Sequence, residues 1–122
     1  TGWNANAFDW PYFINRAFYL DEQSVTQLSP TGNVSEHDDD GRFVNSDVGG
    51  LLLFDLLDGY KQSRYTELES HELAHVSAVE TDMPKLDVDE GWAYAHAPER
   101  FIEYNVRDVQ ATVSINEEVG LI

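Results

Sequence analysis

The chain has 122 residues, enough for one small domain with a hydrophobic core of its own. Its composition is 42% apolar with 12% aromatic residues, which excludes an intrinsically disordered chain, and the lack of Cys excludes disulfides and thiolate metal sites. There are 23 acidic and 7 basic side chains, giving a formal charge of −16. Because salt at about 1 M screens charge within roughly 3 Å, we interpret this acidity as an adaptation to a saline solvent. The alternative is an acidic surface for a basic partner.

The sequence contains no segment that predicts membrane insertion or secretion. Its longest apolar run, Leu51–Phe54, is far shorter than a membrane-spanning helix. No signal peptide is visible, so we expect a cytoplasmic protein. The chain starts at Thr1 without an initiating Met, and we therefore expect a fragment of a longer protein.

The first half predicts one helix, a polar connection and one strand. Asp9 is a plausible N-cap for a helix over residues 10–20, whose inward face would hold Phe13, Ala17 and Leu20. Residues 21–47 form an acidic connection, expected as a flexible loop or a loose hairpin. An apolar run after a Gly pair predicts a buried strand over residues 48–55.

The second half predicts helices only. The first covers residues 56–63, and the capping box Thr66-x-x-Glu69 opens a second that ends near Val79. A break over 81–87 and a short helix over 88–95 follow. The last helix starts at Ala97-Pro98 and ends at Gly120, a favoured C-terminal residue. Nothing indicates a second domain, so we treat residues 1–122 as one.

The last helix carries the first candidate site. Tyr104 and Asp108 are four residues apart and therefore share one helix face, where a phenol beside a carboxylate can position water near a metal ion. The plain alternative is a solvated Asp beside a half-buried Tyr. Apolar residues also recur at roughly helical spacing, which predicts one buried stripe. Its members are Phe101, Ile102, Val106, Val109, Val113 and Ile115.

The second candidate site lies at the start of the first helix, in Asn4-x-x-x-Phe8-Asp9. A carboxylate at a loop-to-helix junction can bind Mg²⁺, which prefers oxygen ligands. The aromatic ring before it can stack on a nucleobase. The structural alternative is that Asp9 only caps its helix.

A third candidate, His71-Glu72-Leu73-Ala74-His75, matches the zinc-binding pattern His-Glu-x-x-His on a predicted helix. No downstream residue stands out as a third zinc ligand; Glu90 and His96 are available without a specific reason. The capping box already explains this helix structurally, and surface histidines are the alternative. Asp55 is expected to cap the helix at residue 56 or to contact a site.

In their order, these motifs resemble the 3′–5′ proofreading exonuclease domain of family B DNA polymerases, of the archaeal kind, with an acidity similar to that of haloarchaeal proteins. Asn4-x-x-x-Phe8-Asp9 matches the second exonuclease motif and Tyr104-x-x-x-Asp108 the third. Residues 53–57 and 65–68 between them resemble the family's strand and the following helix start. The resemblance covers nearly the whole chain.

The resemblance implies an α/β, ribonuclease-H-like exonuclease fold, here partial and helix-rich. It implies that Asp9 and Asp108 bind the catalytic Mg²⁺ or Mn²⁺ ions and that Tyr104 orients the attacking water. Asn4 and Phe8 would hold the terminal nucleotide of a single-stranded 3′ end of DNA. The remainder of the polymerase would be the other partner.

One part of the family pattern is missing from these residues. The first exonuclease motif, Asp-x-Glu on the first strand, supplies two further carboxylates, and the acidic run Asp38–Asp40 does not replace it. We therefore expect incomplete catalysis from the 122 residues alone, and folding within a longer polymerase or as a homo-oligomer. A zinc metallopeptidase built on His71, Glu72 and His75 and a non-catalytic binding module remain the alternatives.

Overall fold

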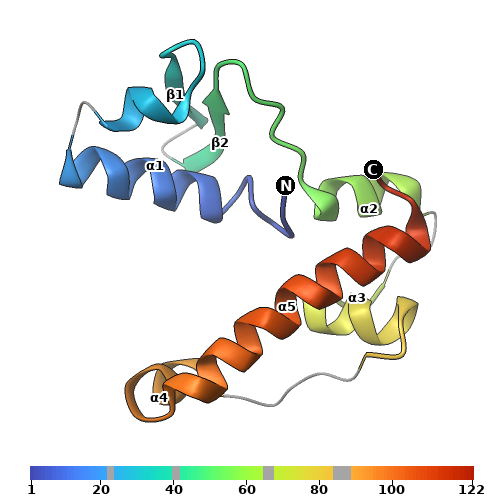
Figure 1. Ribbon diagram of the computed structural model, residues 1–122. Helices are drawn as coiled ribbons and strands as arrows, with labels where there is room; N and C mark the ends of the chain where they lie inside the picture. The colour runs from blue at the N-terminus through green and yellow to red at the C-terminus, as the bar shows by residue number, and fades with distance from the viewer. Residues whose placement is uncertain (22–23, 40–41, 65–67, 84–88) are drawn as a thin grey trace. The chain divides into compact units, whose positions relative to one another are not determined.

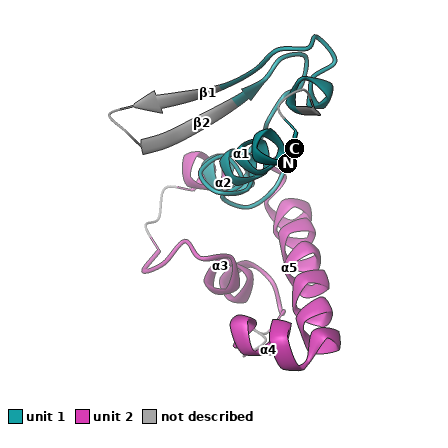
Figure 2. Ribbon diagram, turned by 90° about the vertical axis from the view of Figure 1, so that its left-hand side faces the viewer, with its two compact units in different colours: residues 1–59 teal, residues 60–122 magenta. Residues whose placement is uncertain are grey.

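The computed structural model describes residues 1–21, 24–39, 42–64, 68–83 and 89–122, and is rich in helix (Figure 1). The chain forms two compact units, residues 1–59 and 60–122 (Figure 2). A helix-rich chain with a small sheet is what a partial α/β domain would show. In chain order the elements are α1 (Asp9–Leu20), η1 (Ser24–Leu28), β1 (Val34–Asp39), β2 (Arg42–Val48), α2 (Leu56–Ser63), α3 (Leu73–Glu80), α4 (Glu90–His96) and α5 (Pro98–Val119).

The core of the first unit joins α1, η1 and β2. Ile14, Val25 and Val48 are buried together, one from each element, and Trp10 and Ala17 pack against them. The helix predicted over residues 10–20 is confirmed. Its predicted inward face was partly wrong, because α1 turns the side that carries Ile14 to this core. The side chains of Phe13 and Leu20 are exposed.

The strands β1 and β2 pair in antiparallel orientation as the two arms of a hairpin. The register runs from Val34 opposite Val48 to Asp39 opposite Arg42, with an irregularity between His37 and Asp38. Of the two expected forms of the acidic connection, the structure has the hairpin, preceded by the short helix η1. Its base is fixed to the core because Val48 is fully buried and Val34 packs beside it. The flexibility of this connection stays a prediction.

The strand predicted over residues 48–55 was wrong. Only Val48 belongs to β2; a turn follows at Gly49 and Gly50, where Gly50 has φ +84°, a conformation suited to glycine. Leu52 is 90% exposed. A buried strand needs hydrogen-bonded neighbours, and among the described residues this run pairs only through one parallel bridge between Gly2 and Asp55.

The second unit is built around α5, on which α3 and α4 both pack. The helix begins with Pro98 and ends at Gly120, whose φ of +70° gives the expected left-handed cap. The predicted apolar stripe was largely wrong, because Ile115 is its one fully buried member and the other residue that α5 buries, Ala111, was not predicted. Four of the predicted residues are about half or more exposed: Ile102, Val106, Val109 and Val113.

The helix predicted over residues 56–63 is confirmed, whereas the one predicted from Thr66 begins only at Leu73. Part of the capping box (65–67) lies outside the described residues, and residues 68–72 are not helical. The hydroxyl of Ser70 accepts a hydrogen bond from the backbone N–H of Glu72, just before α3. The short helix predicted over 88–95 is found as α4, and of the predicted break, residues 81–83 are described and non-helical.

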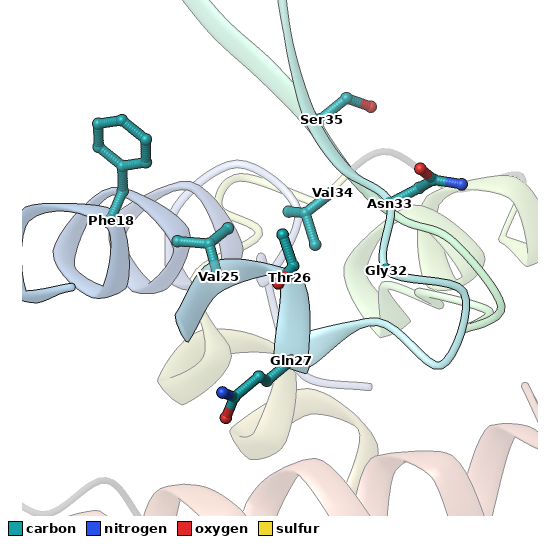
Figure 3. Close-up of a pocket in the computed structure, with 8 residues that line it drawn as sticks. All are labelled: Phe18, Val25, Thr26, Gln27, Gly32, Asn33, Val34 and Ser35. Atoms are coloured by element: carbon teal, nitrogen blue, oxygen red, sulfur yellow. The ribbon is translucent and has the colours of Figure 1, made fainter. Parts of the chain in front are cut away.

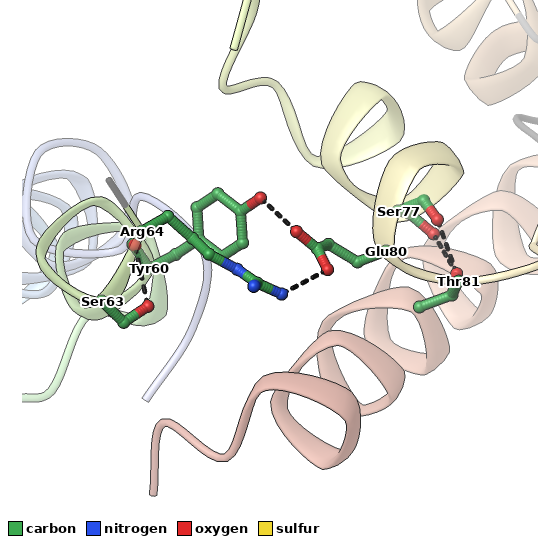
Figure 4. Close-up of polar contacts among 6 residues, drawn as sticks. All are labelled: Tyr60, Ser63, Arg64, Ser77, Glu80 and Thr81. Carbon is green, nitrogen blue, oxygen red and sulfur yellow. Dashed lines mark hydrogen bonds and ion pairs between the residues drawn. The ribbon is translucent and has the colours of Figure 1, made fainter. Parts of the chain in front are cut away.

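A polar cluster joins the end of α2 to the end of α3 (Figure 4). The hydroxyl of the fully buried Tyr60 donates to one carboxylate oxygen of Glu80 at 2.6 Å, and Arg64 pairs with the other oxygen at 2.6 Å. Burial and the hydrogen bond to Glu80 raise the pKa of Tyr60 to about 12. The cluster therefore stabilises the packing of the second unit while the phenol keeps its proton.

Candidate active site

The loop before α1 is held by the carboxylate of Asp55. The backbone N–H groups of Asn4 and Asn6 each donate to it at 2.9 Å. Behind this loop the backbone N–H of Leu56 donates to the carbonyl of Gly2 at 2.9 Å. Of the two roles expected for Asp55, the structure confirms the cap on α2, since Leu57 at the start of that helix also donates to it. Its role in contacting a functional site stays a prediction.

Asp9 is the first residue of α1, and Phe8 is the residue that precedes it as N-cap. The structural alternative, in which Asp9 caps the helix, is therefore wrong, because no side chain makes a cap hydrogen bond at this end. Partial burial, followed by the negative charge of Asp55, raises the pKa of the Asp9 carboxyl. Its carboxylate lies at the positive end of the α1 dipole, which favours an anion there.

A pocket of about 380 Å³ lies beside Asp9 in the first unit. Aromatic side chains form much of its wall, and its lining is Thr1, Gly2, Ala5, Asp9, Trp10, Tyr12 and Phe13. Next to it, the rings of Phe8 and Tyr12 lie nearly parallel, 6° apart in orientation, with centroids separated by 6.3 Å. Both rings are about two-thirds exposed and thus accessible to a planar ligand.

Tyr104 and Asp108 face the same neighbour on α4. The hydroxyl of Tyr104 donates to Glu90 at 2.8 Å, and this bond, with burial, raises the pKa of the phenol well above its usual value. Burial also raises the pKa of Asp108. The hydrogen bond from Tyr104 lowers this pKa, and the negative charge of Glu90 raises it further. The expected pair on one helix face is thus present, as a phenol between two carboxylates.

The structure therefore groups the predicted residues in two sets. Asn4, Phe8 and Asp9 lie together at the start of α1 in the first unit, and Tyr104 and Asp108 lie together on α5 in the second. Sequence reasoning did not assign Glu90 to the second set. Its partner is on the next helix, 14 residues away, so no helical spacing could have indicated it.

The zinc pattern does not have the helical geometry that it requires. His71 and Glu72 precede α3, and only His75 lies inside it. The ring of His71 instead lies edge-on to Tyr60, with centroids 6.5 Å apart. Among the residues that the structure describes, no group of three or more His, Cys, Asp or Glu side chains is arranged to hold a metal ion.

A larger, open hollow of about 930 Å³ lies between α1, η1 and the base of β1 (Figure 3). Its lining carries no titratable side chain and none of the predicted site residues. It is formed by Phe18, Val25, Thr26, Gln27, Gly32, Asn33, Val34 and Ser35. This hollow therefore offers no general acid, no general base and no carboxylate that could bind a metal ion. The catalytic candidates remain the residues at the start of α1 and on α5.

The sequence matches a known protein family over more than half of its length. The model of the family "DNA polymerase family B, exonuclease domain" matches residues 1–76. The chain belongs to this family. The matched region contains Asn4, Phe8 and Asp9, and family membership implies the ribonuclease-H-like α/β fold, of which this chain shows a helix-rich part.

Two curated relatives extend the similarity beyond the family match. The DNA-directed DNA polymerase of Enterobacteria phage T4 is 33% identical over 128 residues, covering 100% of this chain. That of Escherichia phage RB69 is 28% identical over 122 residues, covering 95% of this chain. The chain spans 14% of the length of each relative. Both are phage proteins, so these comparisons give no support to the archaeal and haloarchaeal part of the expected resemblance.

The structure also bears on whether the chain could span a membrane. Within its described ranges, no helix combines the length and the apolar character needed to cross a bilayer.

Proposed function

We propose that these residues belong to the proofreading site of a family B DNA polymerase, which hydrolyses the terminal phosphodiester of a primer in the 3′–5′ direction. The observation that carries this proposal is the family match over residues 1–76, which contains the Asn4–Asp9 motif. The hydrogen-bonded face of α5 with Tyr104 and Asp108 supports it, since it lies in the part aligned with the phage T4 polymerase. Such a domain would act in the cytoplasm.

In this proposal the start of α1 binds the primer end. Phe8 offers an exposed ring on which the terminal base can stack once it has left the duplex. Asn4, held by Asp55 through its backbone, contributes a polar side chain to the same end of the helix. The substrate is therefore a single-stranded or frayed 3′ end of DNA.

Tyr104 would orient the attacking water by accepting a hydrogen bond from it. A phenol has one proton to donate, and in the structure the carboxylates of Glu90 and Asp108 both interact with the Tyr104 hydroxyl. The remaining lone pair of the phenol oxygen can then accept from water, which turns a lone pair of the water toward the phosphorus atom. The raised pKa of Tyr104 keeps the phenol protonated and suits it to this positioning role.

Asp9 and Asp108 would hold the divalent ions, proposed as Mg²⁺ or Mn²⁺. Their oxygen donors fit such hard cations. Burial raises the pKa of both carboxyls, and a bound cation would oppose this by stabilising their charged forms. When bound, such ions lower the pKa of water and stabilise charge at the phosphate. Since the described residues gather no three-ligand group, we propose that carboxylates elsewhere in the polymerase complete the set.

The test is cleavage of a 3′-labelled single-stranded DNA by the full-length protein that contains this segment. Asp108→Asn should abolish cleavage while leaving the fold intact. Glu117→Gln, which removes an exposed charge from the same helix, is the matched control and should cleave at the normal rate. Full activity of Asp108→Asn would overturn the assignment.

A non-catalytic binding module is the second candidate, favoured by the incomplete metal site among the described residues. It predicts that the natural protein binds the DNA but does not cleave it at any Mg²⁺ or Mn²⁺ concentration. Association as a homo-oligomer would be the accompanying arrangement, and sedimentation of the protein would reveal it.

A further inference from the structure

We propose that Asp55 is the positioning residue that fixes the Asn4–Asp9 loop of the exonuclease site. This inference rests on the function proposed above and deepens it. Asp55 itself would touch neither DNA nor metal. It would act through the backbone of the loop that carries the nucleotide-binding and metal-binding side chains.

The carboxylate of Asp55 is buried, with 4% of the residue exposed, and both of its oxygens are used. Oδ1 accepts from the backbone N–H groups of Asn4 at 2.9 Å and Leu57 at 3.0 Å. Oδ2 accepts from that of Asn6 at 2.9 Å. A buried carboxylate with three donors is a strong anchor, because charge-assisted hydrogen bonds are about twice as strong as neutral ones.

Asn4 has φ +59°, the left-handed conformation, which Asn adopts more readily than other residues with a side chain, although at a higher cost than glycine. The hydrogen bond from its N–H to Asp55 helps to hold the loop in this conformation. From the same loop, the carbonyl of Ala5 accepts from the N–H of Trp10 at 2.9 Å. Hydrogen bonds therefore lead from Asp55 through residues 4–6 to the first turn of α1, where Asp9 lies.

Three effects of Asp55 must be separated: the loop anchor, the cap on α2 and the negative charge that acts on Asp9. In Asp55→Asn one carboxylate oxygen is replaced by an NH₂ group. A backbone N–H then loses its acceptor and faces a second donor, which is repulsive. Asp55→Ser keeps a good N-cap for α2 but is too short to bind both loop N–H groups. Asp58→Asn removes an exposed charge from the first turn of the same helix and leaves the anchor intact.

The experiment measures cleavage of a 3′-labelled single-stranded DNA by the full-length protein across a Mn²⁺ titration. A misplaced reacting group costs up to about 100-fold in rate. We expect kcat to fall about 10- to 100-fold in Asp55→Asn and Asp55→Ser, and the half-maximal Mn²⁺ concentration to rise about 10-fold. Asp58→Asn should stay within about 2-fold on both measures. In Asp55→Ser, amide hydrogen exchange should quicken at Asn4 and Asn6 and stay slow in α2.

Several results would overturn the inference. A normal rate and normal Mn²⁺ requirement in Asp55→Ser would do so, as would equal losses in Asp58→Asn, which would assign the effect to charge. Unchanged amide exchange at residues 4 and 6 would also contradict it. If Asp108→Asn is inactive while Asp55→Ser is normal, only this inference fails. If Asp108→Asn is fully active, the proposed function fails and this inference with it.

Discussion

The hydroxyl of Tyr104 donates to Glu90 across 2.8 Å, although 14 residues separate the two along the chain. Tyr104 lies near the start of α5, and Glu90 is the first residue of α4, which packs on α5. Asp108, one turn along α5, also interacts with this hydroxyl through a hydrogen bond, so two carboxylates compete for one phenol proton.

Replacing Glu90 should therefore impair water positioning. In Glu90→Ala the Tyr104 proton loses its acceptor on α4 and is left to Asp108, and we expect kcat for exonuclease cleavage to fall about 10-fold, or about 1.4 kcal/mol of transition-state stabilisation. The KM for DNA should change little, because Glu90 does not hold the nucleotide. Glu90→Gln retains an acceptor oxygen and should keep most of the activity. Glu99→Ala is the exposed control, and equal losses in both alanine variants would contradict this role.

Replacing Phe8 should weaken binding of the primer end. Stacking of a base on an aromatic ring contributes about 1–3 kcal/mol, so Phe8→Ala should weaken binding of a single-stranded 3′ end about 5- to 150-fold. Fluorescence anisotropy in the cleavage-deficient Asp108→Asn background measures this directly. Phe18→Ala removes a similarly exposed ring about 15 Å along the same helix, and its affinity should be unchanged. Equal binding by both variants would exclude stacking on Phe8.

The parts of the fold that could be predicted from the sequence are those that depend on local interactions. The structure confirms the predicted bounds of α2, and it confirms the ends of α5, which follow from Pro98 and Gly120. The expected pairing of Tyr104 with Asp108 was found because a helix brings residues i and i+4 together. These features need no distant part of the chain.

The parts that failed depend on partners far along the chain. The run over residues 48–55 has the composition of a buried strand, but its only ladder contact among the described residues is the bridge of Asp55 to Gly2. The apolar spacing of α5 did not show which side would be covered, and the residues that the helix buries are Ala111 and Ile115. Glu90 was missed for the same reason, since its role depends on how two helices pack.

The packing of α5 can be tested by truncating its buried side. Ile115 is fully buried, and Ile115→Ala should lower the free energy of unfolding by about 2–5 kcal/mol, the usual cost of a cavity of that size. Val113→Ala, on the exposed side, should change it by less than about 0.5 kcal/mol, since alanine also favours helix. Urea unfolding of the two variants measures both values. A larger loss in Val113→Ala would place the core on the other side of α5.

The cluster of Tyr60, Arg64 and Glu80 predicts how stability depends on pH. The pKa of Tyr60 is raised from 10 in the unfolded chain to about 12 in the folded one, chiefly by burial and then by its bond to Glu80. Above pH 10 the folded state therefore binds more protons than the unfolded state, and stability decreases as pH rises. The contribution is fully present below pH 10 and is lost between pH 10 and about 12; at most it amounts to about 3 kcal/mol.

Tyr60→Phe tests this dependence, because it removes the titrating group and keeps the ring. Its free energy of unfolding should decrease less steeply between pH 10 and 12 than that of the natural protein, while Tyr104 contributes equally to both. At pH 7 the variant should be about 1 kcal/mol less stable, since Glu80 loses a hydrogen bond but keeps Arg64. Urea unfolding at a series of pH values gives both slopes. Identical slopes would show that Tyr60 does not stabilise the fold through its proton.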